Sequence, residues 1–120
     1  MSSSVSVIGF EIPLETVVGA VFVQALEKGI SFVPFSTIEE YARRVELISQ
    51  RKLFVWFSRD RMRSAADELG EMFDIVEVDG VRGIMCLGDV ALEKLRERSI
   101  GWLPLDVVAA FLEARVDFGA

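Results

Sequence analysis

Leu53-Phe54-Val55-Trp56-Phe57 is the stretch on which the expected fold depends. It has the length of a strand and lacks the alternation of apolar and polar residues that a half-solvated strand shows. Continuous apolar runs of this kind are typical of strands covered on both faces of a parallel sheet. Ser58 or Asp60 then opens a helix that we expect to end near Phe73. The sequence thus predicts a central strand followed by a crossover helix.

Two strand–helix units precede this run. Pro13 is a natural helix entry, and Gly29 is a favoured residue just beyond a helix end. Ser36 or Thr37 is expected to cap the helix that follows. The expected elements are strands at 5–10 and 30–35, a helix at 14–28, and a second helix that ends near residue 50.

The part after the third helix has a different pattern. Asp79-Gly80 stands between two apolar runs and is the strongest short signal for a β-hairpin. A two-residue loop sets Glu77 opposite Arg82, which is a favourable cross-strand pair. Two helices follow, at 90–98 after Asp89 and from Pro104 to about residue 116. We therefore expect one α/β domain over residues 1–120, with the order β-α-β-α-β-α-β-β-α-α. Its three layers would enclose a mixed, mostly parallel sheet, ending in the hairpin and two helices.

Composition indicates a soluble intracellular chain. Hydrophobic residues make up 52% and charged residues 27% of the 120 residues, with a net charge of −6. The longest apolar run is too short to cross a bilayer, and the N-terminus lacks the features of a signal peptide. The single cysteine, Cys86, cannot form an internal disulfide and is expected to be buried. We expect a cytoplasmic protein without membrane contact. The absence of asparagine and the scarcity of glutamine suggest a thermophilic source.

The chain contains no histidine, which removes the commonest general base and most zinc and iron sites. Asp74, Glu77 and Asp79 could form a carboxylate set for Mg²⁺, but the turn and the pairing with Arg82 explain two of them. No cofactor, metal or catalytic residue is predicted. An enzyme remains conceivable in forms that need no histidine, such as arginine-held phosphoester chemistry or a carboxylate acid–base pair.

Basic residues are concentrated in the segment 43–63. Seven cationic side chains stand there against two carboxylates, a net charge of +5, which leaves −11 for the rest of the chain. Arginines at a helix start after a strand could contact phosphate, since free backbone N–H groups there favour anions. The alternative is that they pair with the surrounding acidic surplus. The candidate ligand or phosphate-binding residues are Arg59, Arg61, Arg63, Arg51 and Lys52.

The first and last predicted helices carry apolar residues on more than one face. A helix that is apolar all round must be covered on nearly every side, and a small domain has a limited interior. Either the fold buries both helices, or they form a self-association or partner surface. The candidate interface residues are Val18, Phe22, Val23, Val107, Phe111 and Phe118.

The function expected from the sequence is a non-catalytic interaction or regulatory module that self-associates or is a subunit of a larger assembly. The alternative is a binder of a phosphate-bearing ligand or nucleic acid through the segment 43–63. The negative net charge disfavours nucleic acid, because contacts to phosphate supply most non-specific affinity. A homo-oligomer or a protein partner is the expected form.

Overall fold

The structure is a computed structural model that describes residues 9–118. Within this range the chain forms five strands and five helices. The strands are β1 (Gly9–Glu11), β2 (Phe32–Pro34), β3 (Lys52–Phe54), β4 (Phe73–Val78) and β5 (Val81–Cys86). The helices are α1 (Leu14–Glu27), α2 (Phe35–Ser49), α3 (Arg59–Leu69), α4 (Leu92–Ile100) and α5 (Leu105–Glu113). Most of the strand expected at 5–10 lies outside the described residues.

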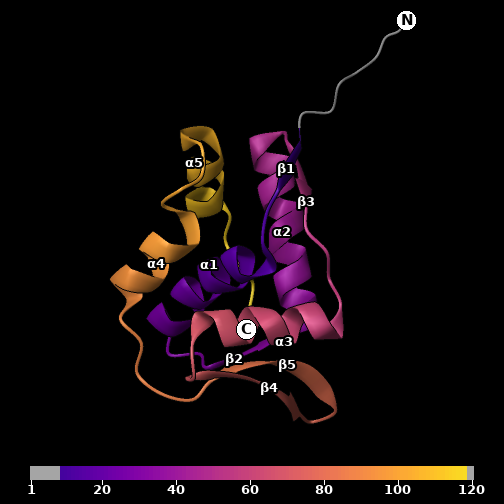
Figure 1. The fold of residues 1–120 in the computed structure, drawn as a ribbon, viewed down its shortest axis with the longest axis vertical. Helices are drawn as coiled ribbons and strands as arrows, with labels where there is room; N and C mark the ends of the chain where they lie inside the picture. Colours follow the sequence, from indigo (N-terminus) through magenta and orange to yellow (C-terminus); the bar gives the residue numbers. More distant parts are fainter. Residues whose placement is uncertain (1–8, 119–120) are drawn as a thin grey trace, which may run out of the picture.

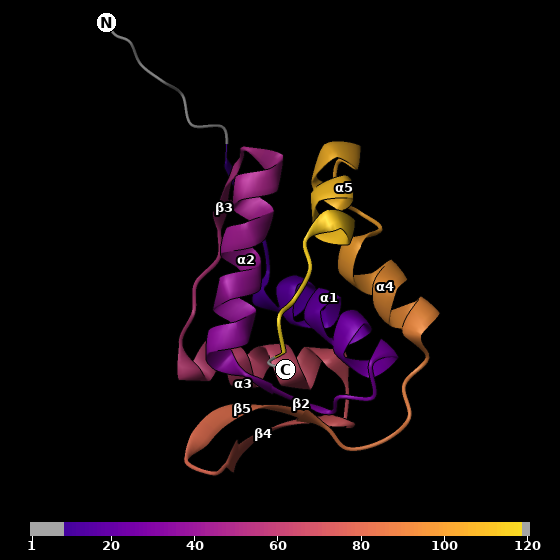
Figure 2. The ribbon, with the colours of Figure 1, turned by 180° about the vertical axis from the view of Figure 1, so that it is seen from behind.

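Helix α1 lies at the centre of the molecule (Figure 1). It packs most extensively against α3 and α4 and also contacts α2 and β2. Eleven of its 14 residues are buried, as a helix that is apolar all round requires. Helices α2 and α5 pack against each other at one end of the molecule (Figure 2). The hydrophobic core is therefore arranged around α1.

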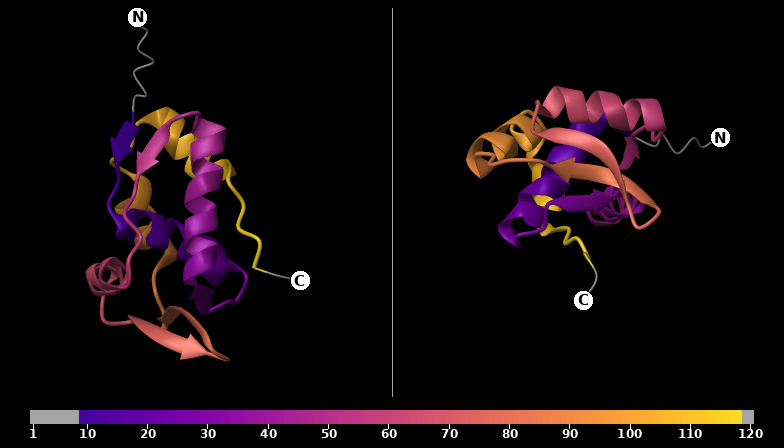
Figure 3. Two further views of the ribbon diagram at one scale, coloured as in Figure 1. Left: turned by 90° about the vertical axis from the view of Figure 1, so that its right-hand side faces the viewer. Right: turned by 90° about the horizontal axis from the view of Figure 1, so that it is seen from below.

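The predicted mostly parallel, three-layer sheet is wrong. The described strands form two separate sheets. β1 and β3 make a two-stranded parallel sheet beside α2, whereas β2, β5 and β4 make a three-stranded antiparallel sheet at the far end of that helix (Figure 1 and Figure 3). The fold is α/β, with a small antiparallel sheet and five helices along the described chain.

Strand β2 joins the hairpin because β5 offers it an antiparallel partner. The hairpin at Asp79-Gly80 forms as predicted, with Glu77 opposite Arg82. The other edge of β5 pairs with β2 and sets Val33 against Ile84, both fully buried.

Gly83 permits the close approach of these two strands. A Cβ atom there would meet the carbonyl oxygen of Val33 and would lie 2.7 Å from Cζ of Phe32. Antiparallel pairing between β2 and β5 therefore depends on a small residue at position 83, which faces Pro34 in the register. The pattern of residues within either strand does not reveal this pairing.

Strand β3 is shorter than the apolar run that contains it. Its pairing with β1 ends where Glu11 faces Phe54, and the N–H of Ile12 donates one further hydrogen bond to the carbonyl of Phe54 (3.1 Å). The segment that follows β1 then turns at Pro13 into α1. Residues 55–57 consequently have no strand partner within residues 9–118, and the run is not the doubly covered strand that its composition predicts.

Some helix ends follow the sequence and others do not. Ser58 caps α3 as predicted, and Gly29 follows α1 with a φ of 74°. The expected caps at Ser36 or Thr37 and at Asp89 are wrong. Pro34 precedes α2 directly with a φ of −61°, and α4 begins three residues after Asp89. The fixed φ of proline presets the entry to a helix without a side-chain cap.

Candidate functional site

Most of the basic segment is neutralised by carboxylates of the same chain. Nε of Arg51 lies 2.6 Å from Oδ2 of Asp106 at the start of α5. Nζ of Lys52 lies 3.5 Å from Oε2 of Glu46 on α2. The remaining ion pairs of the segment are Arg63–Asp74, Arg43–Glu39 and Arg44–Glu40. These contacts agree with the alternative that the basic residues pair with the surrounding carboxylates. They do not bring the candidate arginines together at one site.

Arg59 and Arg61 differ from the others. Both are exposed in the first turn of α3, and neither forms an ion pair with another described residue. The cap of this helix is already made, because Oγ of Ser58 accepts a hydrogen bond from the N–H of Arg61 (3.1 Å). Arg61 also lines an open hollow between α1 and α3.

This hollow, called here the acidic hollow, has a volume of about 540 Å³. It lies at the carboxyl ends of β1 and β3, between the first turns of α1 and α3, where ligands of parallel sheets usually bind. Three carboxylates and one guanidinium line it, a net charge of −2. Its lining is Glu11, Ile12, Pro13, Leu14, Glu15, Trp56, Asp60, Arg61 and Ser64. The three carboxylates would repel an anion, whereas Arg61 and the N-termini of α1 and α3 would attract one.

A second open hollow lies at the other end of β3, beside the last turns of α2. It is called here the basic hollow, and its volume is about 470 Å³. Three cationic side chains and one carboxylate line it, a net charge of +2. The lining residues are Arg43, Glu46, Leu47, Gln50, Arg51 and Lys52. Each of these cations is already paired with a carboxylate of the chain, Glu39, Asp106 and Glu46 respectively, so the basic hollow is not a free positive site.

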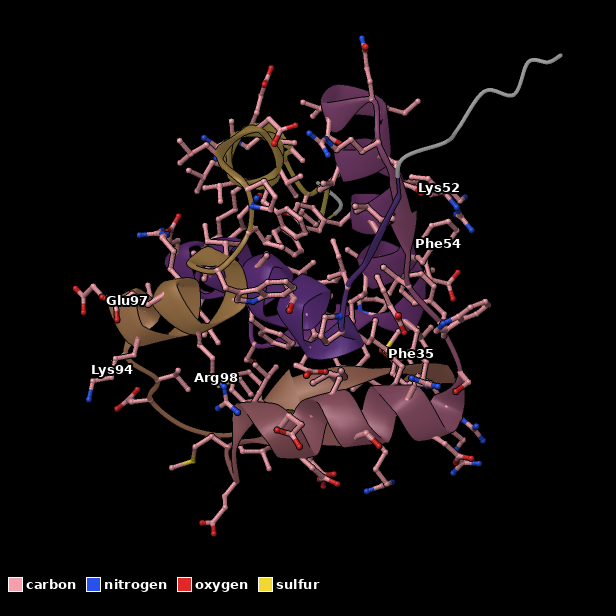
Figure 4. All side chains as sticks on the ribbon, turned by 45° about the horizontal axis from the view of Figure 1, so that its top comes forward. Phe35, Lys52, Phe54, Lys94, Glu97 and Arg98 are labelled. Atoms are coloured by element: carbon pink, nitrogen blue, oxygen red, sulfur yellow. The ribbon has the colours of Figure 1, made fainter. Side chains whose placement is uncertain are left out.

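The surface between these hollows is apolar and aromatic. From residue 52 to residue 58, exposed side chains alternate with less exposed ones, so that Leu53 enters the core while Phe54 and Trp56 face solvent. Phe54 is 42% and Trp56 61% exposed. Glu11 faces Phe54 in the register and shares its side of the sheet. Figure 4 shows Lys52 and Phe54 directed out of the molecule on one side of β3. Glu11, Lys52, Phe54 and Trp56 are called here the outer face.

The outer face is the feature that sequence reasoning misses. A continuous apolar run is the pattern of a strand with two covers, so Phe54 and Trp56 are assigned to the interior. One signal in the sequence could have indicated this exposure. Phe54 and Trp56 are two residues apart, which places them on the same side of an extended segment, and a polar helix start follows them directly.

The predicted interface residues lie elsewhere. Val18, Phe22 and Val23 of α1, together with Val107 and Phe111 of α5, are buried within a single copy of the chain. The rings of Phe22 and Phe73 meet edge to face with their centroids 5.0 Å apart. Phe111 meets Tyr41 in the same way at 5.8 Å. These five side chains are therefore not available to a partner.

Phe118 is only partly buried, and Nζ of Lys28 lies 5.8 Å from its ring centroid. Other exposed apolar residues lie at the end of α2 and at the start of α5. Leu105 on α5 is 87% exposed and Leu47 on α2 is 78% exposed. Trp102 is exposed as well, so both tryptophans of the chain face solvent. The surplus apolar surface is real, but it belongs to different residues from the predicted ones.

A small interior cleft of about 60 Å³ lies between α1, α4 and α5. Its polar groups already have partners, because the hydroxyl of Tyr41 donates to the carbonyl of Phe111 (2.6 Å) and Gln24 bonds the backbone at 114 and 116. Burial raises the pKa of Tyr41, with the nearby charge of Arg115 acting weakly in the opposite direction. The hydrogen bonds of Tyr41 and Gln24 in this cleft tie α5 and the segment after it to α2 and α1.

The described residues contain no group of three or more acidic, cysteine or histidine side chains that could hold a metal ion. Glu77 contacts Arg82 across the hairpin (3.6 Å), and Asp79 takes a left-handed conformation in the turn. Cys86 is buried, as predicted, and its Sγ donates to the carbonyl of Gly88 (3.1 Å). None of the helices formed by residues 9–118 combines the length and the apolar character needed to traverse a bilayer.

Compared with known proteins, the chain matches no protein-family model, and no curated protein or solved structure is significantly similar to it.

Proposed function

We propose that this chain is a non-catalytic interaction or regulatory module that self-associates or serves as a subunit of a larger assembly. The observation that carries the proposal is the outer face, where Phe54 at the end of β3 and Trp56 just beyond it expose their aromatic rings. Large exposed aromatic residues are enriched at the centres of protein interfaces and are costly to leave in water.

The apolar residues at the helix ends add to this support. Leu47, Trp102 and Leu105 are exposed on segments that are otherwise well packed. Monomeric proteins tolerate scattered apolar side chains, but aromatic patches flanked by charged residues mark interaction sites.

Light scattering on the purified chain tests the proposal. The monomer has a mass of 13.4 kDa, and we expect the measured mass to rise with concentration from the low micromolar to the high micromolar range. A constant monomer mass over this range, with no protein retained on the immobilised chain, contradicts the proposal.

Binding of a phosphate-bearing ligand or nucleic acid through the segment 43–63 is the second candidate function. It is favoured by the position of Arg59 and Arg61, which stand without an ion pair among the described residues at the start of α3. Fluorescence anisotropy with a labelled oligonucleotide tests it, because contacts to phosphate weaken steeply as salt is raised. If Arg59→Glu with Arg61→Glu leaves the anisotropy unchanged, this function is wrong.

A further inference from the structure

We propose that the first half of α3 enters the major groove of duplex DNA through its exposed side chains. These side chains are called here the α3 face, and they are Arg59, Asp60, Arg61, Arg63 and Ser64. This inference rests on the second candidate function and narrows its ligand to duplex DNA. The opposite side of the helix is buried, where Met62, Ala65 and Ala66 pack into the core.

The arginines of the α3 face are available to an anion. Arg59 and Arg61 form no ion pair with any other residue of the range 9–118. The contact between Arg63 and Asp74 is 3.7 Å long, and both side chains are more than half exposed. Water screens such a pair, so little is lost when it opens. Three guanidinium groups and one carboxylate give the α3 face a local charge of +2, although the whole chain carries −6.

The shape of this surface favours a grooved partner over a small ligand. Figure 1 shows α3 lying across the end of the molecule that is opposite α5. A small phosphate-bearing ligand needs a hollow that surrounds it, whereas the α3 face is the outside of a helix. Its six positions, 59–64, span about 9 Å along the helix axis. The major groove of DNA is about 12 Å wide and admits an α-helix.

The side chains of the α3 face are of the kinds that read base edges. An arginine donates two hydrogen bonds to guanine, and a carboxylate accepts one from the amino group of cytosine. Asp60, which stands between Arg59 and Arg61, would repel phosphate but can serve a base. The mixed charge of the α3 face therefore suits the floor of the groove better than the DNA backbone.

The helices are arranged so that α3 can be inserted. Helix α2 runs along the long axis of the molecule, and α3 lies across it (Figure 1). Helix-turn-helix proteins hold two helices in this relation and place the second one in the major groove. In this chain, the segment 50–58 joins the two helices and contains β3, in place of a short turn.

The β4–β5 hairpin flanks the α3 face. Strand β4 begins four residues after α3 ends and packs against it, so that β4 runs back toward the first turn of α3. In the view from below, the hairpin tip lies on the same side of the molecule as that turn (Figure 3). With α3 in the groove, the tip would face the adjacent phosphates. Asp79 at the tip is exposed and forms no ion pair among residues 9–118, so it would oppose binding.

Fluorescence anisotropy with a labelled DNA duplex at low salt tests the arginines. We expect Arg59→Ala and Arg61→Ala each to weaken binding about tenfold, because each removes a contact to a base or a phosphate. Arg43→Ala is the matched control, since it removes the same charge from an exposed position on α2. We expect it to change the affinity by no more than about twofold. An equal loss in all three variants would show that only overall charge matters, and would overturn the inference.

The hairpin tip provides an independent test of the arrangement. Asp79→Asn removes the charge and keeps a residue that tolerates the left-handed conformation of this position. We expect it to tighten binding about threefold and to make the affinity fall more steeply with salt. Glu113→Gln on α5 is the matched control, because Glu113 is exposed and belongs to a helix at the other end of the molecule (Figure 1). If the two variants have equal effects, the hairpin does not lie beside the DNA and the arrangement is wrong.

The choice of probe separates this inference from the second candidate function. We expect the duplex to bind at least tenfold more tightly than either of its single strands. Equal binding of a single strand overturns the major-groove contact and leaves the second candidate function intact. Displacement of the duplex by polyglutamate at equal charge concentration would assign the α3 face to acidic proteins and would also overturn the inference. If neither form of DNA binds, binding of nucleic acid is excluded as a whole. Circular dichroism melting verifies that each variant is folded.

Discussion

Replacement of Gln24 measures how firmly α1 holds the C-terminal segment. Its Nε2 donates to the carbonyl of Ala114 (2.7 Å), and its Oε1 accepts from the N–H of Val116 (3.0 Å). All three residues are buried, and 90 or more positions separate Gln24 from its partners. One side chain therefore satisfies both a donor and an acceptor in a segment that follows the last helix (Figure 2).

Gln24→Leu preserves the approximate shape and removes both hydrogen bonds. Each lost bond costs about 1 kcal/mol, and each buried backbone group left without a partner adds a desolvation penalty of similar size. The greater apolar burial of leucine offsets about 1 kcal/mol of this loss. We expect the free energy of unfolding to fall by about 3 kcal/mol, which corresponds to a decrease in Tm of about 10 °C for a domain of this size.

Urea unfolding followed by circular dichroism measures the change. Gln50→Leu is the matched control, because Gln50 is exposed beyond the end of α2, and it should shift the free energy of unfolding by no more than about 0.5 kcal/mol. A Gln24→Leu variant as stable as this control would refute the reasoning, since it would mean that the C-terminal segment does not need the two hydrogen bonds.

Three further predictions concern packing, the turn and the single tyrosine. Gly19→Ala should destabilise the fold by about 1–2 kcal/mol in thermal melts despite the better helix propensity of alanine, because the new Cβ would meet Oγ of Ser99 on α4. Adding Ser99→Ala should recover part of this loss of stability. If the effects of the two substitutions are simply additive, this account is contradicted. Gly80→Ala should cost about 1 kcal/mol in urea unfolding, since Gly80 has a φ of 79° in the hairpin turn; an unchanged midpoint would show that the turn tolerates the strain. The absorbance of the Tyr41 phenolate should appear only at a pH well above about 10, the ordinary pKa of tyrosine, because burial raises the pKa of Tyr41 in the folded state. Its contribution to stability is then complete below pH ~10 and is lost as the pH rises further, and a titration with the ordinary midpoint in the folded protein would contradict this.

Local signals in the sequence predict local structure well. Asp79-Gly80 sets the hairpin and its register, because a two-residue turn leaves a single way to pair the flanking strands. Ser58 and Gly29 mark helix ends through interactions within a few residues. The burial of Cys86 likewise follows from its apolar surroundings.

Partnerships between distant segments are predicted poorly. The apolar runs at 30–35 and 53–57 predict strands but not neighbours, and the structure places them in different sheets. The same limit affects the candidate site. An apolar residue on α1, such as Phe22, and an apolar residue on β3, such as Phe54, look alike in sequence, yet the first is buried and the second exposed.

The sequence by itself determined the order of the elements, the hairpin and the concentration of basic residues, because each depends on residues close together along the chain. Tertiary structure alone decided which strands pair, which apolar faces remain in water and which arginines are neutralised. The physical reason is that packing and ion pairing join groups many residues apart, as Arg51 and Asp106 show. The outer face with its exposed aromatic rings, on which the proposed function rests, exists only in three dimensions.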